Sequence, residues 1–398
     1  MVSIIRFSRG GVMTYAEHRR IIDVDSHVIE LDDFLHNAAR SEHLDLLPSM
    51  LEQKSLPVVQ AGLDRGRELF AKRQSDPAVM AKFEASLMDN TKSGWNRLGA
   101  FDAKERSHTL DLLGFEMQWV LPTFSFHQMM HAAIGDALAA SSMTLNKAMA
   151  DFCANDSRLR AVGYLPLNLG PETAQKIMQQ GFADGCYTFM VPTNEPNPDN
   201  RSFTHPDFDP IWAGFAERRT PVALHVAANG NYSAVSPSFK NNGKDQAALG
   251  GDAPAGELNL LNIGASAELF ISAMIFDEVF ARHPNLRVIS MEHAATWLPS
   301  WLQQLDFTAN LLKRKRMFSE APSETAKRHL KVSPFAGEPV GWIIENVGPD
   351  MLVFASDYPH PEGTGNPIAK FERTMENCDQ ATMDRFYHGN MLEVMGVA

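Results

Sequence analysis

The chain carries an aspartate and a histidine two residues apart, Asp25 and His27, at the end of an apolar run that begins at Ile21. Side chains two apart on a strand point to the same face, so a carboxylate and an imidazole would be presented together. This pair suits Zn²⁺, Fe²⁺ or Mn²⁺. The alternative is an ordinary strand-end loop in which Asp25 caps the following helix. A metal site requires further ligands from elsewhere in the chain.

Other ionisable side chains also follow apolar runs that we expect to be strands. His225, His293 and Asp357 each stand at the end of such a run. In a barrel of parallel strands the carboxyl ends converge on one rim, where active sites lie. A lone histidine at a strand end is usually structural. Three imidazoles and two carboxylates on one rim, however, predict a metal centre.

The fold expected from the sequence is an α/β fold, a (β/α)₈ TIM barrel, because short apolar segments alternate with helical ones. We expect one domain over residues 1–398, with a parallel sheet. The expected strands span residues 21–30, 117–123, 160–166, 185–192, 221–226, 286–293, 330–334 and 351–357.

Two connections are too long to be simple loops between a strand and its helix. We expect residues 31–113 to form a helical insertion over the barrel mouth. Residues 227–258 are rich in Gly, Asn, Ser and Ala, which favours a long loop acting as a lid or subunit contact. The alternative for this second segment is a plain surface connection.

Composition excludes several classes of protein. The net charge of −12 argues against a nucleic-acid partner, and the basic run 313–316 is expected on a solvated helix face. Cys153, Cys186 and Cys378 are far apart and form no zinc or disulfide pattern, as in a cytoplasmic protein. No signal peptide and no uninterrupted apolar run near 18 residues is found, so we expect no membrane association.

Several motifs carry a resemblance to a known family. These are Asp23-Val24-Asp25-Ser26-His27-Val28, Leu224-His225, Pro284-Asn285-Leu286-Arg287-Val288, Glu292-His293-Ala294-Ala295-Thr296-Trp297-Leu298-Pro299, Ala355-Ser356-Asp357-Tyr358-Pro359-His360 and Gly389-Asn390. From Ile22 to its end, the chain resembles the amidohydrolase superfamily. The closest resemblance is to the amidohydrolase-related branch with aminocarboxymuconate-semialdehyde decarboxylase and the resorcylate-type decarboxylases.

The resemblance implies a role for each strand-end residue. The family's metal ligands fall on Asp25, His27, His225 and Asp357. His293 then lies beside the metal and acts on substrate or water. Asp357 can also serve as the general base that accepts the proton of a metal-bound water. His293 and Asp357 are therefore the expected catalytic residues.

Two departures from the family pattern bear on the metal. The first pair is Asp-x-His, where many members have His-x-His or Glu-x-His. A carboxylate there makes the site harder and shifts preference somewhat from Zn²⁺ toward Mn²⁺ or Fe²⁺. The expected strand 185–192 has no lysine, so the carbamylated lysine that bridges two metals elsewhere in the superfamily is missing. We expect one divalent ion, Zn²⁺ first with Mn²⁺ or Fe²⁺ as alternatives. Glu30, Glu195 and Glu292 leave a second ion open.

The expected function is decarboxylation or hydrolysis of a small carboxylated organic substrate, through a metal-activated water or a metal-gripped substrate. One alternative is an iron-containing oxygenase with one or two metals on the same barrel. Another is a non-catalytic partner subunit. We expect a small-molecule substrate and a homodimer or larger homo-oligomer.

Further side chains have open roles at this level. Arg106 and Arg201 are candidates for binding a substrate carboxylate, because the guanidinium fork matches it. His360 is either an orienting residue for the site or a rim histidine bonded to backbone. We expect the remaining candidates to be structural, or to pack rather than bind; these are His127, His131, His388, Trp297 and Phe126.

Overall fold

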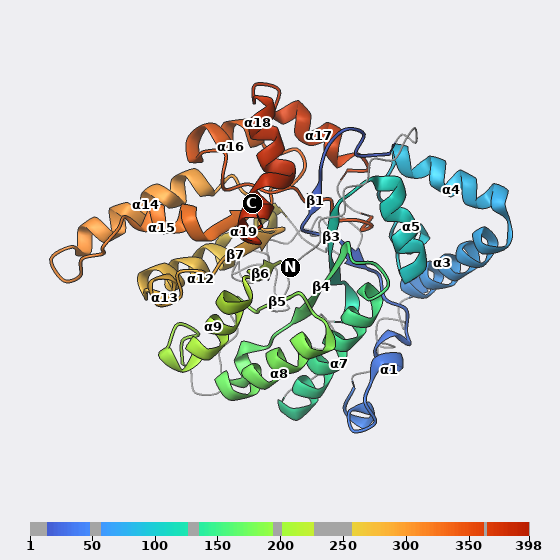
Figure 1. Cartoon of the computed structure of the whole chain (residues 1–398), viewed down its shortest axis with the longest axis horizontal. Coiled ribbons are helices and arrows are strands. Elements are labelled where there is room, and N and C mark those ends of the chain that lie inside the picture. Colours follow the sequence, from blue (N-terminus) through green and yellow to red (C-terminus); the bar gives the residue numbers. More distant parts are fainter. Residues whose placement is uncertain are drawn as a thin grey trace, which may run out of the picture.

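A curled parallel sheet forms the centre of the computed structural model (Figure 1). The structure describes residues 14–47, 57–125, 135–193, 201–226, 257–361 and 364–397. The strands are β1 (Ile22–Asp23), β2 (His27–Val28), β3 (Met117–Pro122), β4 (Leu159–Tyr164), β5 (Thr188–Met190), β6 (Val222–His225), β7 (Val288–Met291) and β8 (Leu330–Val332).

Strand order follows chain order, as expected for successive βα units. The sheet runs β1-β3-β4-β5-β6-β7-β8, and β2 pairs with β3. The two edges are joined through the segment that follows residue 351. Val353 N–H donates to Val332 O of β8 at 3.1 Å, and Val24 N–H after β1 donates to Phe354 O at 3.2 Å. These bonds place the expected eighth strand between β8 and β1.

Two expected strands are less regular than the sequence predicted. The first is divided into β1 and β2, with Asp25 in the gap. The eighth is held by isolated parallel bridges at Leu352 and Tyr358 instead of a continuous ladder. One cause is Asp23, whose carboxylate accepts from Ser356 N–H at 2.8 Å and so takes that group out of the backbone ladder. The regular backbone hydrogen bonding between strands is therefore interrupted where the side chains of the site are positioned.

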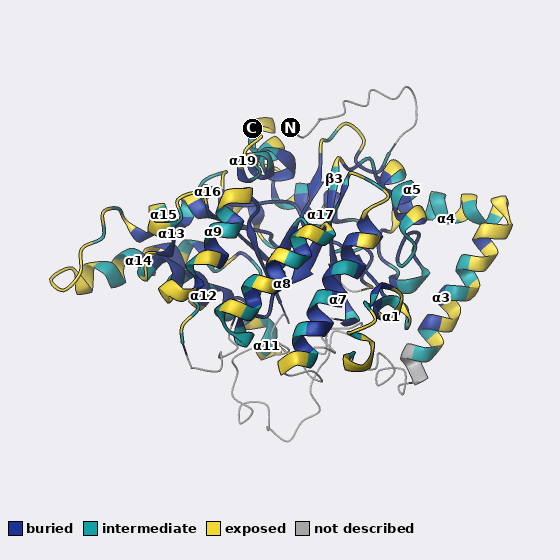
Figure 2. Cartoon of the chain, turned by 60° about the horizontal axis from the view of Figure 1, so that its bottom comes forward, coloured by how far each residue is buried: buried dark blue, intermediate teal, exposed yellow. Residues whose placement is uncertain are grey.

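Helices surround the sheet, and their buried faces pack on it (Figure 2). α8 shows how the sequence sets such a helix: Pro171 opens it, and Gly185 ends it in the left-handed conformation at φ 116°. The helices after β3 are α7 (Gly135–Cys153), η3 (Leu167–Leu169), α8 (Pro171–Asp184), η4 (Pro206–Phe208), α9 (Asp209–Arg218), α11 (Glu257–Leu261), α12 (Ala265–Phe276), α13 (Val279–Arg282), α14 (Leu298–Leu312), α15 (Pro322–His329), α16 (Val340–Val347), α17 (Pro367–Thr374), α18 (Gln380–Asp384), the π-helix η5 (Arg385–Gly389) and α19 (Asn390–Val394).

The connection between β2 and β3 includes several helices. It contains α1 (Phe34–Ala38), η1 (Leu44–Leu46), α3 (Pro57–Ser75), α4 (Pro77–Asp89), η2 (Gly94–Asn96) and α5 (Ala103–Leu113). α3 and α4 extend to one side of the sheet, and a buried ion pair between Arg73 and Glu105 joins α3 to α5 (Figure 1). Most of the expected 227–258 loop lies outside the described residues; Leu258 belongs to α11.

One described stretch, Glu257–Phe276, has the length and mean hydropathy of a membrane span. The stretch reaches this mean hydropathy because it has few charged residues. Its apolar run is nevertheless interrupted by polar residues, which is why the sequence shows no uninterrupted apolar run. The buried face of α12, which includes Phe270, Ile271 and Met274, packs into the core beside the sheet. This packing is that of a core helix.

Candidate metal centre

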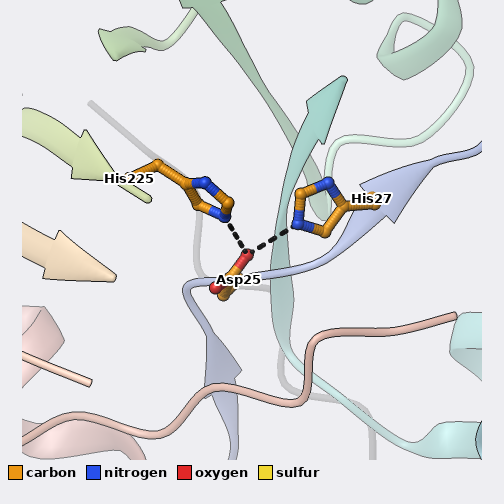
Figure 3. Close-up of side chains that lie close together, drawn as sticks. All are labelled: Asp25, His27 and His225. Carbon is orange, nitrogen blue, oxygen red and sulfur yellow. Dashed lines mark ion pairs between the residues drawn. The ribbon is translucent and has the colours of Figure 1, made fainter. Parts of the chain in front are cut away.

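Asp25, His27 and His225 point toward one another at the carboxyl ends of the central strands (Figure 3). Nε2 of His27 lies 3.2 Å from Oδ1 of Asp25, and Nε2 of His225 lies 3.5 Å from the same oxygen. All three side chains are buried, with exposed fractions of 1%, 1% and 4%. The gap between β1 and β2 turns the Asp25 carboxylate toward β6, where His225 is the last residue.

Both imidazoles are held through their other nitrogen. Nδ1 of His27 lies 3.1 Å from Pro122 O at the end of β3, and Nδ1 of His225 lies 2.8 Å from Val226 O. A carbonyl can only accept, so Nδ1 carries a proton in each ring and Nε2 is the nitrogen that faces the cluster. Metal-binding histidines are commonly oriented in this way.

The donor set fits a divalent cation. Among the described residues, no group forms a hydrogen bond of good geometry with either oxygen of Asp25 or with Nε2 of His27. Leaving a buried polar group unsatisfied costs about 1–3 kcal/mol. The ligand atoms of Asp25, His27 and His225 lie within 4.8 Å of one another, close enough to share one ion. A bound metal would satisfy all of them.

Asp357 stands on the other side of His27. Its Oδ1 lies 3.8 Å from Nε2 of His27 and 3.1 Å from Nδ1 of His360. A left-handed backbone conformation at Asp357, φ 53°, directs the side chain, and its N–H donates to Asp25 O at 2.8 Å. His27, Asp357 and His360 form a second group with metal-ligand spacing. The four residues expected as ligands are thus neighbours.

His360 lies against the first group as well. Its ring stacks on that of His27, with centroids 3.9 Å apart, and its Nε2 is 2.9 Å from Thr123 Oγ1. Of its two expected roles, an orienting residue or a rim histidine bonded to backbone, the contacts to Asp357, His27 and Thr123 match the first.

Lys92 is a site residue that sequence reasoning missed. Its Nζ donates to Oδ2 of Asp357 at 2.6 Å and to the backbone oxygen of the same residue at 2.7 Å. The two residues are 265 positions apart. Lys92 lies in a short turn between α4 and η2, and no periodicity or motif marks it in the sequence. Only the folded chain reveals it.

His293 and Glu292 border the centre from β7. His293 is buried, its Nδ1 lies 3.0 Å from Ser290 Oγ, and it belongs to neither ligand group. Its role beside the metal stays a prediction. Glu292 Oε2 lies 3.5 Å from Nε2 of His225, so this carboxylate faces the cluster. Both Glu292 and Ala294 have positive φ, 55° and 57°, which turns the chain sharply after β7.

Other predicted candidates lie away from the cluster. Glu30 is not placed as a ligand, because its carboxylate accepts from the backbone N–H groups of residues 123–125. Arg106 is not placed to bind substrate: it is buried and donates to Gly99 O, Gln118 Oε1 and His27 O. Arg201 pairs with Asp207 at the surface.

The candidates expected to be structural divide into two sets. Nε2 of His388 lies 3.0 Å from Glu116, and Nε1 of Trp297 donates to His293 O at 3.0 Å, so both have structural contacts. The others, Phe126, His127 and His131, lie outside the described residues. Glu195, considered above for a second ion, also lies outside them.

Burial and mutual interactions shift the pKa values of the buried residues in the cluster. Burial alone would raise the pKa of Asp25, but His225 and His27 hold it well below its usual range. Burial alone would lower the pKa of His225, but Asp25 raises it to about 9. Burial lowers the pKa of His27 to about 4 and that of His293 to about 3. A proton on His225 thus supplies the charge that a bound metal would supply in its place.

The two outer carboxylates differ in charge state. Burial would raise the pKa of Asp357, but Lys92 and His360 lower it to about 2, so this group is ionised. Burial and the neighbouring Asp357 raise the pKa of Glu292 well above its usual range. One of the two acids is thus charged while the other tends to hold its proton.

Comparisons with known proteins bear on the family and the fold. The family model for amidohydrolases matches residues 22–396. No match is found among curated protein sequences. A crystal structure of an amidohydrolase from Mycobacterium avium subspecies paratuberculosis is 20% identical, with a TM-score of 0.70, over 96% of this chain and 99% of that one.

Two decarboxylases share the fold at lower identity. The 2,6-dihydroxybenzoate decarboxylase from Rhizobium is 13% identical, with a TM-score of 0.58, over 95% of this chain and 99% of that one. The 5-carboxyvanillate decarboxylase from Novosphingobium aromaticivorans, solved with manganese and 4-hydroxy-3-methoxy-5-nitrobenzoic acid, is 15% identical. Its TM-score is 0.59, over 95% of this chain and 96% of that one.

Proposed function

Because the chain belongs to the amidohydrolase family over nearly its whole length, we propose that it is a metal-dependent enzyme that decarboxylates a small carboxylated organic molecule. The observation that carries the proposal is the buried convergence of Asp25, His27 and His225, whose ligand atoms lie within 4.8 Å of one another. Asp357 completes the set beside His27. We also propose that the joined edges of the sheet make the fold a closed (β/α)₈ barrel.

A divalent ion at this position would supply Lewis-acid chemistry, either polarising a substrate oxygen or lowering the pKa of bound water to about 7. Two carboxylates and two imidazoles suit Zn²⁺ or Mn²⁺. The 5-carboxyvanillate decarboxylase with the same fold is solved with manganese, which favours testing Mn²⁺ first.

The protein side chains would handle the proton. Decarboxylation replaces a carbon–carbon bond with a carbon–hydrogen bond, so the reacting carbon gains one proton as carbon dioxide leaves. His293 is the candidate carrier. Its Nδ1 is held by Ser290 at 3.0 Å, which leaves Nε2 for the substrate. Burial lowers the pKa of this imidazole to about 3, so a proton that it takes up from solvent is readily passed on to carbon.

Redox-neutral chemistry with one ion is preferred over an oxygenase with two. The two ligand groups share His27 and are linked by Asp357. Nδ1 of His27 faces Pro122 O, so only Nε2 remains to bind an ion. This sharing supports a single ion position with ligands on two sides.

The test is metal-dependent release of carbon dioxide. Metal-free protein is loaded with Mn²⁺, Zn²⁺ or Fe²⁺ and incubated with 2,6-dihydroxybenzoate, 5-carboxyvanillate and related aromatic acids, with and without oxygen. We expect turnover with Mn²⁺ or Zn²⁺ in the absence of oxygen. Turnover only with iron, in air and with a reductant, would instead identify an oxygenase. Absence of carbon dioxide release from all these acids would contradict decarboxylation.

A further inference from the structure

Lys92 brings a fixed positive charge to one ligand of the proposed metal. Its side chain is buried, and Nζ contacts both the backbone oxygen and Oδ2 of Asp357, at 2.7 and 2.6 Å. An ammonium group is a donor only, so it holds both acceptors of the same residue at once. Oδ1 is left facing His27 and His360.

The turn that carries Lys92 is fastened to the loop after Asp357 on both sides. Thr91 N–H donates to Gly365 O at 2.8 Å, and Gly94 N–H donates to Pro359 O at 2.7 Å. Lys92 N–H donates to Asn90 Oδ1 at 2.9 Å, which fixes the turn internally. A Cβ at Gly365 would lie 2.3 Å from that Asn90 oxygen, so the two segments are in close contact. The lysine is built into the site and does not reach in from a mobile surface.

We propose that Lys92 is a positioning residue that keeps Asp357 a one-oxygen ligand of the metal ion. This inference rests on the metal site of the proposed function. By occupying Oδ2, the ammonium prevents the carboxylate from binding the ion through both oxygens. A coordination position then stays open for substrate or water, which catalysis at such sites requires. The β2–β3 connection thereby contributes directly to the chemistry at the strand ends.

The proposed role predicts a specific direction for the change in metal affinity when Lys92 is removed. Residues that orient metal ligands usually strengthen binding, and their loss lowers metal affinity by about 10–100-fold. Lys92 instead competes with the ion for one carboxylate and repels it electrostatically. Its removal should therefore tighten metal binding while slowing turnover. A lysine that serves only the fold would show neither effect.

The protein offers a matched control in Lys331. It is also a buried lysine, and its Nζ donates to the backbone oxygen of Asp350 at 2.6 Å. It differs from Lys92 in contacting none of the residues of the two ligand groups among the described contacts. Lys331→Met therefore removes a comparable buried charge away from the centre.

The experiment is a Mn²⁺ titration of metal-free, full-length protein by calorimetry, with the visible spectrum of the Co²⁺-loaded protein as a second readout. We expect Lys92→Met to bind Mn²⁺ about tenfold more tightly than wild type. Its Co²⁺ absorption should weaken, because the second oxygen of Asp357 raises the coordination number. Lys92→Arg keeps the charge and should stay within about threefold of wild type. Lys331→Met should lower thermal stability but leave Mn²⁺ affinity and the Co²⁺ spectrum unchanged.

Unchanged or weaker Mn²⁺ binding by Lys92→Met would overturn the proposal. If that variant does not fold, a crystal structure of Mn²⁺-loaded wild type decides the question. One oxygen of Asp357 on the ion, with Lys92 on the other, supports the proposal, and both oxygens on the ion overturn it. The Mn²⁺ affinities of wild type and the lysine variants can be ranked without a substrate. Correct affinities without any carbon dioxide release would therefore contradict the proposed reaction and leave the role of Lys92 standing.

Discussion

Removing one partner of the buried ion pair between Arg73 and Glu105 should strongly destabilise the β2–β3 connection. Two parallel hydrogen bonds of 2.6 and 2.7 Å join the side chains, whose exposed fractions are 0% and 4%. Glu105 also accepts from Gly99 N–H at 3.0 Å. Replacing Glu105 by Gln removes the countercharge and leaves a guanidinium buried. Breaking such a pair from one side costs about 3–5 kcal/mol.

The neighbouring pair provides the comparison. Lys72 and Glu68 lie on the same helix at 2.5 Å, but both side chains are more than half exposed. Water screens an exposed pair, so Glu68→Gln should leave stability unchanged within error. The assay is urea unfolding followed by circular dichroism on metal-free protein. Equal unfolding midpoints for Glu105→Gln and Glu68→Gln would refute the reasoning, because burial would then confer no dependence on the countercharge.

Three further predictions concern the centre, the acid limit and the backbone. His293→Asn should abolish turnover but keep the metal; metal loss would instead make His293 a ligand. Burial would raise the pKa of Glu116, but His388 and Arg20 lower it from 4.5 to about 2, so its stabilisation is present above pH 4.5 and lost as pH falls toward 2. Glu116→Gln should therefore reduce the loss of stability across that range in acid unfolding. Gly99→Ala puts a Cβ 2.5 Å from a backbone carbon at a φ of 63°, whereas Gly348→Ala meets no atom within 4 Å. Only the first should lower the free energy of unfolding by more than the ~1–3 kcal/mol of a left-handed residue.

The regular part of the fold was readable because buried parallel strands are nearly continuous apolar runs. The runs at 117–123, 160–166 and 221–226 become β3, β4 and β6 with small shifts at their ends. Prediction was weaker where side chains replace backbone partners. The carboxylate of Asp23 bonds Ser356 N–H, and an apolar run that suggested a regular strand is held only by isolated bridges there.

Site residues at strand ends could be predicted because topology brings them together whatever the connections do. The proximity of Asp25, His27 and His225 could be predicted from the expectation of a parallel sheet alone. Contacts made by the long connection could not be foreseen, since nothing in its local pattern relates it to residues hundreds of positions away. Lys92 was therefore missed. Arg106 was chosen for its chemistry alone, but its position on α5 turns it inward to backbone and side-chain acceptors near β2 and β3.

The central claim is that Asp25, His27, His225 and Asp357 bind one divalent metal ion per chain. Equilibrium dialysis of metal-free protein against Mn²⁺, followed by elemental analysis, measures this directly. We expect about one ion per chain in wild type and its loss in the His27→Ala, His225→Ala double variant, because these rings would supply two of the ligands. His329→Ala, at another buried histidine that stacks on Phe280, should keep the ion. No bound metal in wild type, or undiminished metal in the double variant, would contradict the account.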